Sequence, residues 1–163
     1  MSFHVRRKDK NIADERILRK ILKTSKHITI ALSMNDQPYL VSLTHGYDEE
    51  RNCLYFHCAK EGKKLDYLKR NKNIWGQALL DFGYSENESE CTYLYASVHF
   101  SGRVTLVESL EEKYQGIKFL MNRLDRGLGE RTAKVDPKRL SDTVIGRIDI
   151  EHMTGKKSKE VTV

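Results

Sequence analysis

The sequence predicts a mainly β (α+β) fold: a small six-stranded antiparallel barrel with helices packed on its outside and ends. Six segments have the alternating, aromatic and β-branched pattern of strands, and three have apolar residues at helical spacing. The helices stand at the start, the middle and towards the end of the chain, so the elements do not alternate as βαβ units. Such a barrel fills with its own side chains, and a ligand pocket would need a wall from a second subunit.

The beginning of the chain should form a helix followed by strands. The segment ADERILRKILKTS places four apolar residues at helical spacing behind Asp14, a residue type that caps helices. HITIALSM, YLVSLTHGY and CLYFHCA then have strand character and are separated by the polar turns NDQP and DEERN. We therefore expect a three-strand meander over residues 27–59.

The middle of the chain continues with a helix, two strands and another helix. GKKLDYLKRN predicts a short helix entered at Gly62, and IWGQALLDF predicts a strand. The acidic segment 83–90 has nothing to bury and should be an exposed loop. CTYLYASVHFSGRVTLV predicts a long strand bent near Gly102, and the capping box from Ser109 to Glu112 should start the next helix.

The end of the chain should contain one more strand. Residues 126–142 read as irregular, TVIGRIDIEHM as the last strand, and residues 154–163 as a basic tail. A chain of 163 residues without a linker or repeat is expected to be a single domain spanning residues 1–163.

Charge and hydropathy limit the function classes. The 29 Lys and Arg residues exceed the 23 Asp and Glu residues, so the net charge of +6 favours anionic ligands such as phosphates, nucleotides, nucleic acid or acidic lipid. The opening MSFHVRRKDKN lacks the apolar core of a secretory signal, and no run approaches the ~18 apolar residues of a membrane helix. We expect a soluble, cytoplasmic protein without membrane contact.

Cysteines and histidines do not indicate a metal site. The cysteines are odd in number and lack CxxC spacing, so reduced and mostly buried thiols are expected at Cys53, Cys58 and Cys91. Three histidines stand alone on predicted strands, without an HxH or HExxH pattern: His45, His57 and His99. GxGxxG, GxxxxGK[ST] and Gly-x-Ser-x-Gly motifs are also absent, which disfavours the dinucleotide and NTP folds.

The lysines after Gly62 allow two interpretations. Lys63 and Lys64 fall in the first turn of the predicted helix, where unpaired N–H groups and the helix dipole favour an anion. They would equally suit the solvated face of a helix. The later cations, Lys69, Arg70 and Lys72, fall where a helix end attracts positive charge without any ligand.

Aromatic residues on the long strand also allow two interpretations. Tyr93, Tyr95 and Phe100, with Arg103 nearby, could stack nucleic-acid bases or could serve as core and interface packing. Neither an RNP-like nor a helix-turn-helix pattern accompanies them, which disfavours nucleic acid as a partner.

The order of segments resembles a known superfamily. QPYLVSLTHGYD, LYFHCAKEGKKLDYLKRN, ASVHFSGRVTLVE and IDIEHMTGKKSK, in this order, are similar to the FMN-binding split-barrel flavoproteins related to pyridoxamine 5'-phosphate oxidase. The string YFHCAKEGKKLD resembles most closely the nitroimidazole-resistance (Nim-like) branch. The resemblance implies a six-stranded split barrel that forms a homodimer, with FMN in the clefts between the two subunits.

The resemblance also implies a set of cofactor-binding residues. The family's phosphate-binding turn falls on Gly62, Lys63 and Lys64. His57 and Cys58, at the end of the preceding strand, would lie against the flavin or its ribityl chain, and His57 would be the candidate for proton delivery.

Two further strand segments would contact the flavin ring. The backbone of Leu40, Val41 and Ser42 corresponds to the segment that hydrogen-bonds the pyrimidine edge. Ser97 corresponds to a position on the long strand that faces the ring from the neighbouring side. No metal is implied.

The activity implied by the resemblance is electron or hydride transfer from NAD(P)H to a small nitroaromatic or quinone-like acceptor. Three alternatives remain: a flavin carrier or sensor without turnover, a pyridoxamine 5'-phosphate oxidase-like oxidase, and a nucleic-acid-binding module. The chain ends in TGKKSKEVTV, without the oxidase's arginine-bearing C-terminal segment, and has Lys-Lys where the oxidase favours Arg-Lys.

Overall fold

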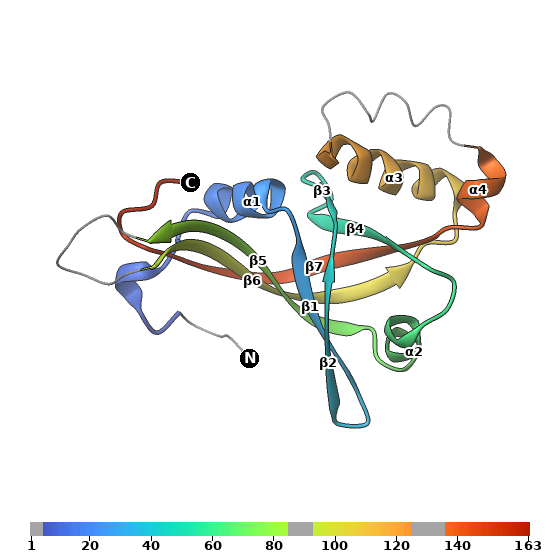
Figure 1. Cartoon of the computed structure of the whole chain (residues 1–163), viewed down its shortest axis with the longest axis horizontal. Helices are drawn as coiled ribbons and strands as arrows, with labels where there is room; N and C mark the ends of the chain where they lie inside the picture. The colour runs from blue at the N-terminus through green and yellow to red at the C-terminus, as the bar shows by residue number, and fades with distance from the viewer. Residues whose placement is uncertain (1–4, 85–92, 125–135) are drawn as a thin grey trace.

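The computed structural model describes residues 5–84, 93–124 and 136–163. Twelve elements follow one another along these residues (Figure 1): η1 (Lys8–Lys10), α1 (Glu15–Thr24), β1 (Ile28–Met34), β2 (Gln37–Leu43), β3 (Gly46–Asp48), β4 (Cys53–Cys58), α2 (Lys63–Arg70), β5 (Asn73–Tyr84), β6 (Tyr93–Leu106), α3 (Leu110–Leu124), α4 (Pro137–Ser141) and β7 (Val144–Lys157). The mainly β class is confirmed. In this part of the chain, no helix is both long and apolar enough to cross a membrane.

The strands form one antiparallel sheet of seven rather than six strands, in the order β2-β1-β5-β6-β7-β4-β3. The expected meander over residues 27–59 is wrong. β1 and β2 form a hairpin as expected. The predicted strand YLVSLTHGY, however, is interrupted at Thr44 and His45. Its last residues belong to β3, which pairs with β4 at the opposite edge of the sheet. Alternation shows that a segment is a strand, but it does not identify the strand's partner.

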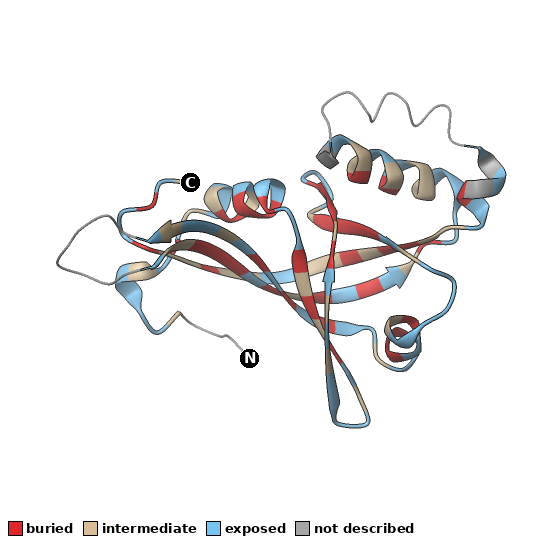
Figure 2. Cartoon of the chain, viewed as in Figure 1, coloured by how far each residue is buried: buried red, intermediate tan, exposed pale blue. Residues whose placement is uncertain are grey.

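The two edges of the sheet meet at one corner. β2 and β3 are the outermost strands, yet only Thr44 and His45 connect them. Three Cα–Cα steps span at most about 11 Å, so the sheet must curl until its edges approach each other there. The rest of β2 pairs with β1 only, and the tip of their hairpin stands clear of the other strands and is exposed (Figures 1 and 2). The barrel is therefore split rather than closed.

β4 is buried on both faces because it divides two hydrophobic clusters. Leu54 and Phe56 belong to the main core, which fills the inside of the curled sheet. Cys53 and Tyr55 point the other way, into a smaller cluster beneath α3. Alternate side chains of a strand point to opposite faces, so the run CLYF is apolar throughout because both of its faces are covered.

Two glycines accommodate aromatic rings of the main core. A Cβ atom at Gly76 would lie 2.2 Å from the ring of Phe100 on the paired strand β6. A Cβ atom at Gly146 would lie 2.2 Å from the ring of Phe56 on the paired strand β4. Each phenyl ring therefore lies across its partner strand, and a larger residue at either glycine would push the ring away.

α1 closes the core near the corner where the sheet edges meet. The Asp14 carboxylate accepts a hydrogen bond from the Arg16 N–H at 2.9 Å, as the predicted cap requires. The buried face of α1 turns towards the strands (Figure 2), and Leu22 is fully buried. At the corner, the ring Nε2 of buried His45 lies 2.7 Å from the Leu22 carbonyl oxygen. This hydrogen bond joins the link between β2 and β3 to the end of α1.

α3 begins with half of the predicted capping box. Ser109 Oγ accepts from the Glu112 N–H at 3.4 Å, but the Glu112 side chain turns away from the cap. It accepts hydrogen bonds from Arg51, from the Tyr55 hydroxyl and from Arg147 on β7. Burial opposes ionisation of Glu112, yet its contacts, led by the hydrogen bond from Arg147, hold its pKa below the usual range. This network ties α3 to the strands below it.

The last strand is longer than expected. β7 continues through residues 154–157, which pair with β6, and Val161 beyond it is buried in the main core. Residues 154–163 are therefore not a free basic tail, because strand pairing and the apolar side chains of Val161 and Val163 anchor them. Where a bend near Gly102 is expected, the pairing of β6 with β7 shifts register between Ser101 and Gly102, and Glu151 of β7 is the extra residue.

Two predicted irregular segments fall largely outside the described residues. The structure does not describe residues 85–92, which include Cys91, or residues 125–135. Of the segment expected to be irregular over 126–142, the described end contains the short helix α4.

Replacing His45 should destabilise the corner of the sheet. His45→Leu leaves the buried Leu22 carbonyl without this donor, which we expect to lower the free energy of unfolding by about 2 kcal/mol. Urea denaturation followed by circular dichroism measures the change. His152→Leu, at an exposed position of β7, is the control and should change stability by less than about 0.5 kcal/mol. Equal losses in the two variants would show that the corner hydrogen bond has no special role.

Candidate functional site

The edge strand β2 offers backbone hydrogen-bonding groups to a ligand. Among the described strands it pairs with β1 alone. Pro38 has no N–H, so it fits only where the strand's N–H would point away from β1. Directions alternate along a strand, and Leu40 and Ser42 therefore present their N–H and C=O groups to the same open side. These residues are two of the three predicted to bind the flavin ring through their backbone.

Val41, the third residue of that segment, faces the opposite way. Its side chain packs against the main core, together with that of Tyr39. The side chains of Leu40 and Ser42 are exposed on the outer face of the sheet, where the Ser42 hydroxyl lies 3.0 Å from the Thr29 hydroxyl of β1. The alternation expected from the sequence is therefore present, and the open backbone groups come from every second residue.

The start of α2 has the form of an anion-binding turn. Gly62 precedes the helix with φ of 132°, a conformation that side chains with a Cβ rarely adopt, and it is exposed. Its carbonyl oxygen accepts from the Leu65 N–H at 2.9 Å, and no side chain among the described residues caps the helix. Lys63 and Lys64 occupy the first two helical positions. Uncapped N–H groups and two ammonium groups thus lie at one helix end.

Aromatic rings position both lysines. Lys63 Nζ lies 4.6 Å from the ring centroid of Tyr39 and 5.7 Å from that of Tyr67. Lys64 Nζ lies 5.5 Å from the ring centroid of Phe56. A cation over a ring is attracted to its negative face, so these contacts keep the ammonium groups beside β2 and the end of β4.

Only one of these lysine–ring contacts, that of Lys63 with Tyr67, could have been predicted from the sequence. Lys63 and Tyr67 are four residues apart on one helix and share a face, which spacing alone could have shown. Tyr39 lies on β2, and its ring centroid is 5.3 Å from that of Tyr67. Its contact with Lys63 depends on the tertiary packing of α2 against the β1–β2 hairpin.

His57 and Cys58 point to opposite faces of β4. Cys58 is half-buried and packs against the main core, where burial raises the pKa of its thiol and the charge of Lys64 partly offsets that effect. The His57 side chain is exposed on the other face. One ligand surface therefore cannot contact both side chains through this strand alone. Burial also raises the pKa of Cys53 to about 11, and the described cysteines are free thiols.

Ser97 lies far from β2 within one chain. It is only 4% exposed, and it pairs with Leu79 on β5 and Lys156 on β7. In the sheet order, β1 and β5 separate β2 from β6, which puts the two strands about 14 Å apart. Ser97 does share the outer face of the sheet with Ser42, because directly paired residues point to the same side.

The outer face of the sheet exposes large apolar side chains. Leu40 of β2 is 66% exposed, Trp75 of β5 is 44% exposed and Leu79 of β5 is 50% exposed. Leu40 and Trp75 are both paired with Ala31 of β1, so they form one row across three strands. Burial of such a surface is favourable by roughly 25 cal/mol per Å². The face that carries Ser42 and Ser97 is thus suited to contact with another protein surface.

The remaining candidates do not gather into a site. Lys69 and Arg70 are exposed in the last turn of α2, where the helix dipole favours cations. Phe100 is fully buried in the main core, whereas Tyr93 is exposed and donates to Asp81, so the proposed aromatic platform is not one surface. Across residues 5–84, 93–124 and 136–163, no group of His, Cys, Asp and Glu side chains could hold a metal ion.

An antiparallel sheet that curls without closing, with an open edge strand beside a lysine-bearing helix start, defines a split β-barrel protein. The chain belongs to the family described as "Pyridoxamine 5'-phosphate oxidase", whose family model matches residues 14–157. The resemblance inferred from the sequence is confirmed at this level. No curated protein matches the sequence significantly.

Solved structures share this fold. The flavocytochrome Anf3 from Azotobacter vinelandii has a TM-score of 0.79 at 20% identity, over 95% of this chain and 72% of that one. An FAD and heme binding protein from Mycobacterium smegmatis has a TM-score of 0.76 at 19% identity, over 94% and 76% of the two chains. A candidate 5-nitroimidazole antibiotic resistance protein from Bacteroides thetaiotaomicron has a TM-score of 0.71 at 22% identity, over 90% and 86%. At these identities the likeness concerns the fold.

Proposed function

We propose that this protein is an FMN-binding flavoprotein that acts as a homodimeric, NAD(P)H-dependent reductase of small acceptors. The observation that carries the proposal is the open edge of β2 beside the uncapped start of α2. A single ligand with a phosphate at one end and a hydrogen-bonding ring at the other matches the two features. Membership of the pyridoxamine 5'-phosphate oxidase family and the flavoproteins among its structural relatives support this assignment.

The residues at the turn fit the phosphate of FMN. The N–H groups at the start of α2 donate, and Lys63 and Lys64 supply positive charge. The outward N–H and C=O groups of Leu40 and Ser42 suit the alternating donors and acceptors of the flavin's pyrimidine edge. Cys58, half-buried beside Lys64, would contact the ribityl chain. Bound flavin supplies the electron and hydride transfer, and the chain supplies binding and orientation.

A second copy of the chain would complete the site. The apolar row on the outer face of the sheet is a suitable dimer surface, because its burial removes exposed Leu40 and Trp75 from water. Ser97 lies about 14 Å from β2 in its own subunit, so its strand would approach the flavin held by the partner instead. A cleft between two subunits would also provide room for the ligand, although the inside of each barrel is filled by its own side chains.

The proposed reaction is the two-electron reduction of a nitroaromatic or quinone. For a nitro group, NAD(P)H and one proton convert R–NO2 to R–NO, with NAD(P)+ and water as the other products. Hydride transfer itself needs no acidic or basic side chain. His57, the sequence-based candidate for delivering the proton, is exposed on the face of β4 opposite Cys58, so it would not face the flavin that Cys58 contacts in the same subunit. The structural likeness to a candidate nitroimidazole resistance protein is in line with this acceptor class.

Removing both turn lysines should weaken FMN binding selectively. Lys63→Ala combined with Lys64→Ala removes two charge-assisted contacts, so we expect a loss of about 3 kcal/mol, roughly 100-fold in Kd. Fluorescence titration of the apoprotein measures binding. Riboflavin, which lacks the phosphate, is the matched ligand, and its affinity should stay within a factor of about two. Full flavin occupancy in the purified double variant would refute the phosphate assignment.

Introducing a charge on the outer face should break the dimer. Trp75→Glu places a carboxylate in the middle of the apolar row, and burying it unpaired is costly. We expect a dimer for the unaltered protein and a monomer with reduced flavin content for the variant, measured by light scattering coupled to gel filtration. Lys69→Glu, an exposed change on α2, is the control and should remain dimeric. A monomer with full flavin occupancy in the unaltered protein would contradict the shared site.

Anaerobic addition of NADH or NADPH should bleach the flavin absorbance of the purified protein. A later addition of a nitroaromatic acceptor should restore it, because the acceptor reoxidises the flavin. Mass spectrometry of the released cofactor should identify FMN. Colour that persists in excess NADH and NADPH would favour the carrier or sensor alternative, and hydrogen peroxide formed from pyridoxamine 5'-phosphate in air would favour the oxidase.

A further inference from the structure

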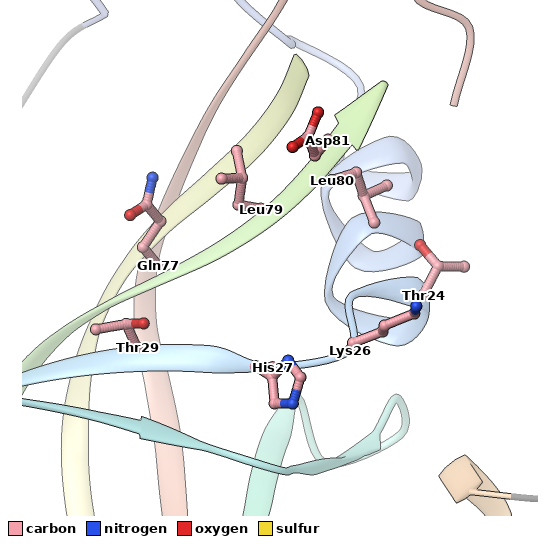
Figure 3. Close-up of a pocket in the computed structure, with 8 residues that line it drawn as sticks. All are labelled: Thr24, Lys26, His27, Thr29, Gln77, Leu79, Leu80 and Asp81. Atoms are coloured by element: carbon pink, nitrogen blue, oxygen red, sulfur yellow. The ribbon is translucent and has the colours of Figure 1, made fainter. Parts of the chain in front are cut away.

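A pocket of about 460 Å³ lies beside the proposed flavin site, between the end of α1 and β5 (Figure 3). β1 pairs with β5 only as far as Ala78. Beyond Ala78, β5 continues without β1 as a partner, because the residues before β1 turn away and lead back to α1. The pocket lies in the space between α1 and this part of β5. The lining residues come from α1, the α1–β1 turn, β1 and β5: Thr24, Lys26, His27, Thr29, Gln77, Leu79, Leu80 and Asp81.

The pocket adjoins the ring end of β2 rather than the phosphate turn. Thr29, in its wall, shares a hydroxyl–hydroxyl contact of 3.0 Å with Ser42. Tyr39, which contacts Lys63, stands three residues earlier on β2, about 10 Å away along the strand. A flavin with its phosphate at Lys63 and its ring edge along β2 would therefore point its ring towards this pocket. That placement suits the molecule that exchanges electrons with the flavin.

Lys26, with the hydrogen-bonding ring of His27 next to it in the chain, favours a carboxylate on that molecule. Lys26 and His27 stand on one side of the pocket. Among the lining residues the only carboxylate is Asp81, which already accepts the Gly83 N–H at 2.8 Å and the Tyr93 hydroxyl at 3.0 Å. These donors compensate its charge and hold it on the far side of the pocket from His27 (Figure 3).

The carbonyl groups at the end of α1 repel an anion less than they would without hydrogen-bond partners. Helix C-termini repel anions through their unpaired carbonyl groups. Here the Thr24 hydroxyl donates to the Lys20 carbonyl at 2.7 Å, and the Ser25 hydroxyl donates to the Ile21 carbonyl at 2.6 Å. The next carbonyl, that of Leu22, lies 2.7 Å from the His45 ring. Donors from the chain itself therefore satisfy two of the last four carbonyls of the helix, those of Ile21 and Leu22.

The apolar part of the wall fits a flat ring. Leu79 and Leu80 flank the pocket, and Figure 3 shows Leu80 directed towards α1 and Leu79 directed to the other side of β5. A volume of about 460 Å³ holds a small aromatic molecule but leaves little room for a dinucleotide. We propose that this pocket is the acceptor site and that it selects small planar acceptors carrying a carboxylate, bound by Lys26 with His27. The acceptor role rests on the proposed function, whereas carboxylate binding can be tested without it.

Two probes of equal shape test the proposal: 4-nitrobenzoate and 4-nitrobenzamide. Isothermal titration calorimetry of the purified protein should give at least tenfold tighter binding of the carboxylate. Raising the salt concentration should weaken the binding of 4-nitrobenzoate and leave that of 4-nitrobenzamide unchanged, because salt screens the attraction between charges. Lys26→Gln should reduce the affinity for 4-nitrobenzoate about tenfold and leave that for 4-nitrobenzamide unchanged. NMR shift changes at the Gln77 side-chain amide should place both probes in the pocket.

A neighbouring lysine provides the matched control. Lys23 is exposed on α1, pairs with Glu49 at 3.2 Å and is not part of the pocket wall. Lys23→Gln should leave the affinities of both probes unchanged. Equal binding of the two probes, an equal effect of Lys23→Gln and Lys26→Gln, or shift changes away from Gln77 would overturn the proposal. Failure of the flavin function is seen separately, as a colourless protein or as flavin that NADH and NADPH do not bleach.

Discussion

The short link between the two edges of the sheet is the constraint on which the rest of the structure depends. Thr44 and His45 carry the chain from β2 at one edge to β3 at the other, so the sheet has to curl. The hydrogen bond between the His45 ring and the Leu22 carbonyl joins this corner to α1. Once the sheet curls, one face becomes a filled core, and the other face together with the open length of β2 remains for contact with ligands and partners.

One strand organises the proposed site. Tyr39, at the start of β2, contacts Lys63 of the phosphate turn. Leu40 and Ser42 offer outward backbone groups, and Ser42 touches Thr29 in the wall of the pocket. A phosphate, a flavin ring and an acceptor would thus follow one another along a single edge. An edge strand is exposed to unwanted pairing, and a bound cofactor and a second subunit would protect these unpaired groups.

The net positive charge has several different origins in the structure. Lys63 and Lys64 are positioned over aromatic rings beside β2, whereas Lys69 and Arg70 lie in the last turn of α2, where the dipole suffices to explain them. Arg147 is part of the network that fastens α3 through Glu112. The net charge of +6 therefore does not show where an anion binds. An anion binds best where lysine side chains lie beside unpaired backbone N–H groups, as at the start of α2.

The sequence by itself determined the local features: the cap at Asp14, the strand periods and the glycine–lysine turn that begins α2. These depend on residues close together in the chain, so short-range patterns report them. Only the tertiary structure decided that β2 and β3 lie at opposite edges, that Cys58 rather than His57 faces the main core, that residues 154–157 extend β7, and that Tyr39 meets Lys63. Strand pairing and helix packing join residues far apart in the chain, and alternation alone does not encode which strands become neighbours.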